Sequence, residues 1–363
     1  MNPGFSKYFI SQVHLEIMIT IDGAKGWGQV VRTAVALSSL TLKPIKLINI
    51  RQSRPRPGIH PQLAEGIRIL AEFCDAETVG LQYGSMGLEF IPKRLNVKDR
   101  TIDIGTSGSI GLLLQTLTPT VIFTRNRTFL ELIGGTAGLG SPTIEYIKNI
   151  TFPVLNKLGL IIPEIKIVRQ GFYPRGGGRV TVNFEPVIKL NPVNLTNRGE
   201  ASSIRGISIV GSLPEEIAIR QAESAKNYLI QKGFDDVKIE TASFPTLSQG
   251  TSITLWAECD NSILGSDNIG KRELRAEDVG KQAAEYLFNS INSQSPFDKY
   301  MADQIIPYLA LAKGRSEIKV EEITEHCRTN ISVCEQILGC KFEIDEKSRI
   351  IEVEGIDFEN KFV

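Results

Sequence analysis

His326 is the side chain in this sequence best suited to covalent chemistry. It is one of three histidines among 363 residues and stands in the run Glu325–Asn330 (EHCRTN). A neutral imidazole keeps a free nitrogen lone pair near pH 7, because its reference pKa is about 6.5. Asp303 and Gln304 precede it by about twenty residues. The Asp303 carboxylate can orient the imidazole, hold a metal or complement a helix dipole. With the glycine-rich segments upstream, this pair predicts a nucleotide-activating enzyme rather than a binding module.

Glycine-rich turns follow predicted strands and precede predicted helices at several places. They include Asp22–Arg32 (DGAKGWGQVVR), Gly105–Ser109, Gly134–Thr136 with Pro142 at the next helix start, and Gly171–Gly178. Such turns can direct backbone N–H groups at a phosphate, or they can simply begin a helix. The first lacks the GxxxxGK[ST] pattern, which excludes a P-loop. Arg32 can reach an anion or remain a surface charge, and Gln115 lies one to two turns inside the helix after Ser109.

The segment Arg51–Gln62 (RQSRPRPGIHPQ) combines three arginines with prolines that stiffen the loop. Arginine pairs with phosphate through two parallel hydrogen bonds. Arg54 and Arg56 are therefore candidates for gripping a polynucleotide phosphate, and the alternative is a solvated charged loop. We expect His60 to be a loop residue rather than the nucleophile.

Composition limits the class of protein. The formal net charge is zero, so the chain lacks the basic field of a nucleic-acid coat protein, although an RNA end can still be held locally. The five cysteines include no CxxC pair, which supports neither a zinc site nor a disulfide framework and suits the cytoplasm. No apolar run reaches the roughly 20 residues that cross a bilayer. Met18 is the expected functional start, with residues 1–17 as an extension.

The order of predicted elements indicates an α/β fold. Strands are predicted at 47–50, 88–91, 101–104, 128–133, 165–168 and 180–184, and helices at 29–40, 61–73, 109–123 and 142–158. They suggest repeated units of a small sheet with two helices. A linker-like stretch near residue 185 begins a predicted inserted α/β domain, 185–275, within a larger domain of 18–184 and 276–363. We expect 261–275 to be a mobile loop, the helix 276–290 to return to the larger domain, and Asp303 to begin a helix that ends near Leu311.

Eight segments in order resemble the RNA 3′-terminal phosphate cyclase family. They are IDGAKGWGQVVRTAVALSSLT, IRQSRPRPGIHPQLAEGI, GTSGSIGLLLQTLTP, GGTAGLGSPTIEY, GFYPRGGG, GKRELRAEDVGKQAAEYL, ADQIIPYLALA and EHCRTNISV. They extend from about residue 19 to 334, and together they are far more specific than any one of them.

The resemblance implies a fold, an activity and a set of site residues. The fold would consist of repeated units of a four-stranded sheet plus two helices, like the enolpyruvyl transferases, with a small inserted domain. The activity would be ATP-dependent conversion of an RNA 3′-phosphate end to a 2′,3′-cyclic phosphate with Mg²⁺ or Mn²⁺, through a histidine-AMP intermediate on His326. ATP-binding positions fall on Arg32, Gln62, Gln115, Pro142, Asp303 and Gln304. Arg54 and Arg56 would contact RNA phosphate, and the oligomeric state stays open, a homodimer included.

The sequence departs from the family pattern at three places. Gly26-Trp27-Gly28 is shorter than the family's EGGGQ run and lacks its metal-binding glutamate, so no metal ligand is assigned. The Gln62 loop is one residue shorter than in the family, because Gln62 is followed directly by Leu63. The family's GGTD motif is replaced by Gly134-Gly135-Thr136-Ala137. These changes keep open a non-catalytic, cyclase-like factor that binds ribosomal RNA during maturation. His326 favours the enzyme, and no signature of an enolpyruvyl transferase is present.

Overall fold

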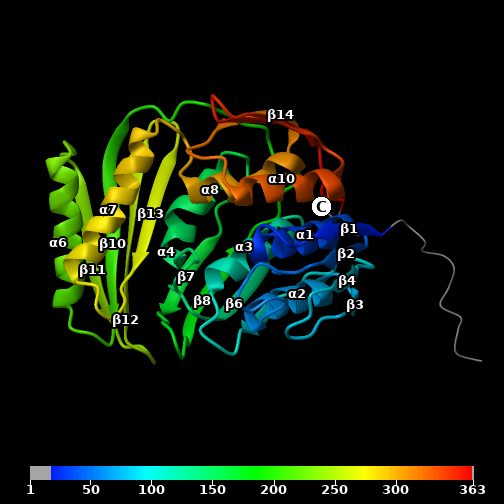
Figure 1. The fold of residues 1–363 in the computed structure, drawn as a ribbon, viewed down its shortest axis with the longest axis horizontal. Coiled ribbons are helices and arrows are strands. Elements are labelled where there is room, and N and C mark those ends of the chain that lie inside the picture. The colour runs from blue at the N-terminus through cyan, green and yellow to red at the C-terminus, as the bar shows by residue number, and fades with distance from the viewer. Residues whose placement is uncertain (1–17, 362–363) are drawn as a thin grey trace, which may run out of the picture.

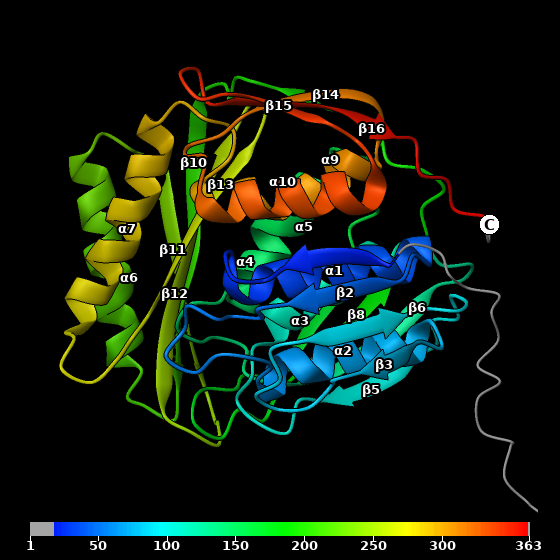
Figure 2. The same ribbon diagram turned by 45° about the vertical axis from the view of Figure 1, so that its right-hand side comes forward.

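Three four-stranded sheets with the same strand order form the body of the molecule. The computed structural model describes residues 18–361, so the predicted extension 1–17 lies outside the described residues. In each sheet the strands lie in the order first, second, fourth, third along the chain. The first two strands are parallel and the remaining neighbours antiparallel. The predicted α/β fold of repeated sheet and helix units is therefore confirmed (Figure 1, Figure 2).

Each repeat runs strand, helix, strand, helix, strand, strand, and its first helical segment makes the crossover that a parallel pair needs. The first repeat contains β1 (Ile19–Asp22), α1 (Trp27–Thr41), β2 (Ile45–Ile48), α2 (Pro61–Phe73), β3 (Glu77–Val79) and β4 (Leu88–Ile91). The second contains β5 (Arg100–Asp103), α3 (Ile110–Val121), β6 (Thr128–Gly134), α4 (Ile144–Tyr146), the π-helical turn η1 (Ile147–Thr151), α5 (Phe152–Asn156), β7 (Glu164–Arg169) and β8 (Gly178–Phe184). The third contains β9 (Asn194–Leu195), α8 (Lys299–Gln304), α9 (Ile306–Leu311), β14 (Lys313–Lys319), α10 (Glu325–Leu338), β15 (Phe342–Asp345) and β16 (Ile350–Ile356).

Helix boundaries follow local sequence, with two corrections. Ser109 caps α3 by accepting a hydrogen bond from the Leu112 N–H at 3.1 Å. The predicted helix 142–158 is observed over 144–156, where α4, η1 and α5 follow one another without a break. Its π-helical turn lies just before Pro153, which lacks the N–H of a regular α-helical pattern. Asp303 does not begin a helix. Asp298 caps α8, accepting from the Tyr300 and Met301 N–H groups at 3.0 Å each, and Asp303 lies near its end.

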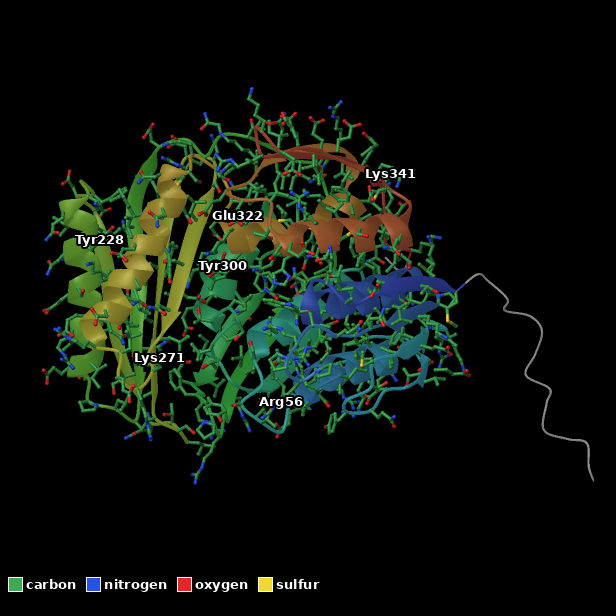
Figure 3. The ribbon with its side chains drawn as sticks, in the orientation of Figure 1. Arg56, Tyr228, Lys271, Tyr300, Glu322 and Lys341 are labelled. Carbon is green, nitrogen blue, oxygen red and sulfur yellow. The ribbon has the colours of Figure 1, made fainter. Side chains whose placement is uncertain are left out.

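A fourth sheet enters the third repeat between β9 and α8. It contains β10 (Ala201–Gly211), β11 (Val237–Phe244), β12 (Gly250–Cys259) and β13 (Ile263–Ile269), with α6 (Glu216–Gln231) and α7 (Ala276–Asn292) on one face. This inserted unit has its own core, in which Leu229, Leu255 and Leu287 are buried. Tyr228 on α6 and Lys341 in the third repeat mark opposite ends of the molecule (Figure 3).

Two predictions about the inserted unit are wrong. The supposed mobile loop 261–275 contains strand β13, which pairs with β12 from Ser252 to Glu258. Its glycine has a packing role, because a Cβ at Gly265 would lie 2.6 Å from Ile150 of the body. Helix 276–290 does not return to the body but packs on the inserted sheet, because Val279 and Ala283 are buried there. The packing favours an inserted unit that includes α7, and the domain boundaries stay a proposal.

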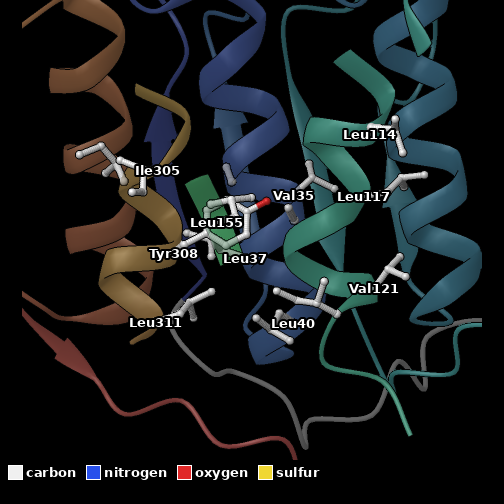
Figure 4. Close-up of a cluster of buried hydrophobic side chains, with 14 of the residues drawn as sticks. Val35, Leu37, Leu40, Leu114, Leu117, Val121, Leu155, Ile305, Tyr308 and Leu311 are labelled. Carbon is white, nitrogen blue, oxygen red and sulfur yellow. The ribbon is translucent and has the colours of Figure 1, made fainter. Parts of the chain in front are cut away.

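The core of the body is a layer of helices between the sheets. Helix α1 contacts α2, α3 and α10. Figure 4 shows this layer, where Leu37 of α1 and Leu155 of α5 lie beside Tyr308 of α9, and Leu117 of α3 points away from them on the other side of its helix. All four are almost inaccessible to solvent. The N-terminal ends of these helices, rather than the sheets, carry the polar side chains discussed next. Among residues 18–361, no helix is long and apolar enough to cross a membrane.

Candidate active site

His326 is the second residue of α10 and lies in the first turn of that helix. Thr324 caps the helix by accepting from the Cys327 N–H at 3.1 Å. The imidazole is partly buried, and its Nδ1 atom has no hydrogen-bond partner among the described residues. Burial lowers the pKa of His326, and the positive charges of Arg32 and Arg54 lower it further. The imidazole is therefore neutral near pH 7, as a nucleophile must be.

The glycine turn before α1 places an indole ring against this histidine. The Trp27 and His326 rings are 5.2 Å apart at their centroids and meet edge to face at 82°. The guanidinium carbon of Arg54 lies 3.3 Å above the Trp27 ring. Gly26 has φ 69°, and a Cβ there would collide with Thr329 Oγ1, so α10 packs directly on the turn. The turn, the arginine loop and α10 therefore meet at one point.

Arg32 and Asp303 lie deeper in the same region. Burial lowers the pKa of Arg32 to about 10, and the charge of Asp303 opposes that shift. Asp303 is 7% exposed, and burial raises its pKa to about 7 despite a hydrogen bond from Gln29 and the charge of Arg32. The pKa of Arg32 falls and that of Asp303 rises for the same reason, because loss of hydration outweighs the attraction between the two charges.

Asn330 connects three helices around this pair. Thr33 on α1 donates its hydroxyl to Asn330 Oδ1 at 2.8 Å, and Asn330 Nδ2 donates to the Asp303 backbone carbonyl at 2.8 Å. Both side chains are buried. Local sequence patterns assign no role to Asn330, because each of its partners lies far away along the chain.

A pocket opens between α1, α3, α8 and α10. Amide, hydroxyl and guanidinium groups share its lining with apolar side chains, a mixture found in small-molecule sites, and its cavity of about 40 Å³ is far smaller than the roughly 300–1,000 Å³ typical of such sites. The polar members are Gln29, Arg32, Thr33, Gln115, Thr151, Gln304 and Asn330, and the apolar ones include Leu37, Leu114, Ile147, Pro307 and Tyr308. Three expected ATP contacts, Arg32, Gln115 and Gln304, thus lie together.

Gln62 and His60 lie in a smaller pocket that shares Arg32 with the first. His60 caps α2: its Nδ1 accepts from the Leu63 N–H at 3.4 Å. Burial, Arg51 and Arg32 lower the pKa of His60 to about 4, so it stays neutral. His60 is thus the N-cap of a helix rather than the loop residue expected from the sequence, and that it is not the nucleophile stays a prediction.

Two expected residues lie apart from this cluster. Arg56 is exposed on its loop at the surface of the first repeat (Figure 3). Pro142 is not among the residues that line the two pockets. Its carbonyl packs near Gly111 at the start of α3, where an added Cβ would lie 2.6 Å from it. Neither residue contacts His326 through any interaction observed here.

The side chains around His326 do not fit a metal held by the protein. No group of three or more histidine, cysteine, aspartate or glutamate side chains with suitable spacing occurs within residues 18–361. The Asp303 carboxylate interacts with the positive charge of Arg32. Trp27, Arg32 and Arg54 lie around the imidazole together with one carboxylate, Glu325, and arginine repels a divalent cation.

Comparison with known proteins gives one consistent result. The sequence model of the family described as RNA 3′-terminal phosphate cyclase matches residues 23–344. A protein of that name from Pyrococcus abyssi is 44% identical over 330 residues, which cover 90% of this chain and 95% of the relative. Proteins with the same name from Caldivirga maquilingensis and Pyrobaculum aerophilum are 41% and 40% identical, covering 93% and 94% of this chain and 97% and 99% of their own.

Proposed function

This chain belongs to the RNA 3′-terminal phosphate cyclase family, and we propose that it converts an RNA 3′-terminal phosphate to a 2′,3′-cyclic phosphate using ATP. The observation that carries the proposal is His326, neutral and partly buried, at a helix start, where it lies within the electrostatic influence of Arg32, a residue of the pocket lining. The three relatives named above carry the cyclase name. A cytoplasmic location remains our expectation from the cysteine content.

In the first proposed step, His326 attacks the α-phosphorus of ATP. The Nε2 lone pair forms the N–P bond, the P–O bond to pyrophosphate breaks, and the proton stays on Nδ1. Nδ1 is buried without a partner, which favours attack by the other ring nitrogen. Covalent catalysis of this kind divides one difficult displacement into easier steps.

The next two steps consume the histidine-AMP intermediate. An oxygen of the RNA 3′-phosphate attacks the AMP phosphorus, and the N–P bond breaks, giving an RNA-(3′)pp(5′)A anhydride. The vicinal 2′-hydroxyl then attacks the 3′-phosphorus, the anhydride bond breaks, and AMP leaves. This last attack is intramolecular, so proximity supplies much of its rate.

The arginines supply the charge that these steps require. Arg32 and Arg54 already act on His326 electrostatically and can stabilise phosphate oxygens in the transition states. Gln115 and Gln304 would hold the nucleotide in the pocket. Gln62, in the smaller pocket, would lie between the nucleotide and the RNA end. A divalent cation would be brought in with ATP, because residues 18–361 contain no group of three or more side chains that could hold it.

A terminal-label assay tests the proposal. An RNA whose 3′-phosphate carries ³²P is incubated with the protein and ATP, then treated with phosphatase. We expect label that resists phosphatase and that appears only with ATP, because a cyclic phosphate is not a monoester. Label that remains fully removable, with a folded protein and with Mg²⁺ or Mn²⁺ present, would contradict cyclisation.

One structural feature favours a second candidate function. Trp27 packs edge to face against His326, in the stretch that lacks the glutamate of the family pattern. A cyclase-like protein with a disabled site could still bind RNA during ribosomal RNA maturation. RNA binding without cyclisation and without AMP transfer to the protein would support that alternative.

A further inference from the structure

A large cleft separates the inserted unit from the body and reaches the candidate active site. Body residues such as Ser107 and Tyr173 line one side, and Arg220 and Lys271 of the inserted unit line the other. Gln62 borders both this cleft and the small pocket that contains Arg32 and His60. A chain lying in the cleft can therefore place its end at Gln62.

The cleft carries a local excess of positive charge in a protein whose formal net charge is zero. Its lining contains one carboxylate, Glu277, and five cationic residues: Arg175, Arg220, Lys271, Arg272 and Arg275. Glu277 pairs with Arg220 at 3.4 Å and with Arg275 at 3.7 Å. Within residues 18–361, Lys271, Arg272 and Arg175 form no ion pair, so their charges are available to a ligand.

The size and the apolar groups of the cleft suit a flexible polymer. Its volume of about 1280 Å³ exceeds the roughly 300–1,000 Å³ typical of small-molecule pockets. The Tyr173 ring is 78% exposed and Leu139 is 74% exposed, both in the lining. Exposed aromatic rings beside a basic groove are the usual means of holding single-stranded nucleic acid, because any base can stack on them.

Contacts at one end hold the two walls of the cleft together. The Arg175 N–H donates to Ser248 Oγ of the inserted unit at 3.1 Å. Phe172 packs so closely on Gly211 and Gly250 that a Cβ at either glycine would collide with its ring. The cleft is therefore a formed feature of the fold, with Tyr173 presented next to this anchored segment.

We propose that this cleft holds the single-stranded RNA segment that precedes the 3′ end. Lys271, Arg272 and Arg175 would contact its phosphates, and Tyr173 would stack on a base, while the terminal phosphate reaches the pocket beyond Gln62. The inference rests on the proposed function, because that function supplies RNA as the ligand. It gives the inserted unit a role as one wall of the RNA site.

The test compares RNA length and cleft charge. Binding of fluorescent 3-nucleotide and 12-nucleotide RNAs with 3′-phosphates is measured without ATP at several salt concentrations. We expect the 12-mer to bind more tightly than the 3-mer to the wild-type protein. Lys271→Glu with Arg272→Glu should weaken 12-mer binding about tenfold or more and lower the salt slope by about 1.4, because about 0.7 is lost per phosphate contact on a single strand. Binding of the 3-mer should hardly change.

Matched variants separate the cleft from overall charge. Lys341→Glu with Lys347→Glu makes the same charge change at the two ends of β15 in the third repeat. Figure 3 shows Lys341 far from Lys271. This variant should bind the 12-mer like wild type. Tyr173→Ala should weaken the 12-mer about fivefold or more through lost stacking. Equal losses of 12-mer binding in the two charge variants would overturn the inference, and so would a wild-type protein that does not prefer the 12-mer. Unchanged 12-mer binding by the Lys271→Glu, Arg272→Glu variant would also overturn it and would leave the cleft to a protein partner.

A parallel assay keeps this inference distinct from the proposed function. Transfer of AMP to the protein needs no RNA, so the cleft variant should be labelled by α-labelled ATP as strongly as the wild type. A wild-type protein that is never labelled, yet binds the 12-mer through the cleft, would contradict the proposed enzyme but support the RNA site. Normal AMP labelling together with unchanged RNA binding in the cleft variant would support the proposed enzyme but contradict the RNA site.

Discussion

Trp27 holds the imidazole of His326 edge to face, with ring centroids 5.2 Å apart and planes at 82°. The two residues are separated by nearly 300 positions in the sequence. The indole ring also contacts Arg54, whose guanidinium carbon lies 3.3 Å from the ring centroid. One side chain therefore orders both the proposed nucleophile and a cation beside it.

Removing the indole should slow the first chemical step. In Trp27→Ala, His326 and Arg54 lose their shared contact, and a cation–π interaction of about 1 kcal/mol disappears with it. We expect AMP labelling in a single turnover to slow about tenfold. Trp27→Phe, which keeps a ring edge against His326, should stay within about threefold of wild type. Faster labelling by Trp27→Ala would mean that the indole obstructs the site instead.

The rate of AMP labelling should depend weakly on pH below neutrality. Burial and the charges of Arg32 and Arg54 lower the pKa of His326, so the free imidazole persists to lower pH than in an ordinary histidine. At pH 6.5, where an unperturbed histidine is half protonated, we expect clearly more than half of the plateau rate. Asp303→Asn serves as the control, because it removes the second group that titrates near neutrality. A midpoint above pH 6.5 in that variant would contradict the assigned surroundings of His326.

Asp303 should make the protein less stable as the pH rises. Its folded pKa of about 7 lies above the ordinary value of 3.8, so the folded state binds the extra proton between those values. Stability is then greatest below pH 4 for this group and falls as the pH rises to 7. The free energy of unfolding of Asp303→Asn, relative to wild type, should rise between pH 4 and pH 8 by up to about 4 kcal/mol. Urea unfolding at both pH values measures it, and a constant difference would refute the shift.

A buried hydrogen bond joins helices of the body beside the inserted unit. The Tyr146 hydroxyl donates to Asp298 Oδ1 at 2.8 Å, and Asp298 Oδ2 accepts from the Gly265 N–H of β13 at 3.0 Å. Tyr146→Phe should cost about 1–2 kcal/mol of unfolding free energy, because a buried acceptor loses a donor. Tyr83→Phe, at a side chain that is exposed, is the matched control and should be neutral. Equal stability of the two variants would show that the bond contributes nothing.

The residues that local pattern could identify were those at helix starts and glycine turns. His326, Arg32, Gln115 and Gln304 could be assigned from the resemblance, and the structure brings the last three into one pocket. Their roles in catalysis remain predictions. Pro142 and Arg56 were assigned in the same way, but they lie apart from that pocket.

What the sequence could not supply were contacts between distant segments. Trp27 contacts His326 of the third repeat and Asn330 accepts from Thr33 of the first repeat, and no local spacing encodes either contact. Strand β13 escaped prediction because Gly265, Ser266 and Asp267 interrupt its apolar pattern. Gly265 and Asp267 contact the body, and Ser266 donates its hydroxyl to the Ala283 carbonyl of α7. Asp267, for example, accepts from the Thr143 N–H at 2.8 Å.

The most direct measurement of the central claim is AMP transfer to the protein. The wild-type protein is incubated with α-³²P-ATP and either Mg²⁺ or Mn²⁺, and label that is acid-labile and alkali-stable is counted. We predict that wild type is labelled and that His326→Ala is not. His60→Asn, which retains a helix-capping side chain, should be labelled normally. Label that persists in a folded His326→Ala variant, or its absence from the wild type with both metals, would contradict nucleotidyl transfer through His326.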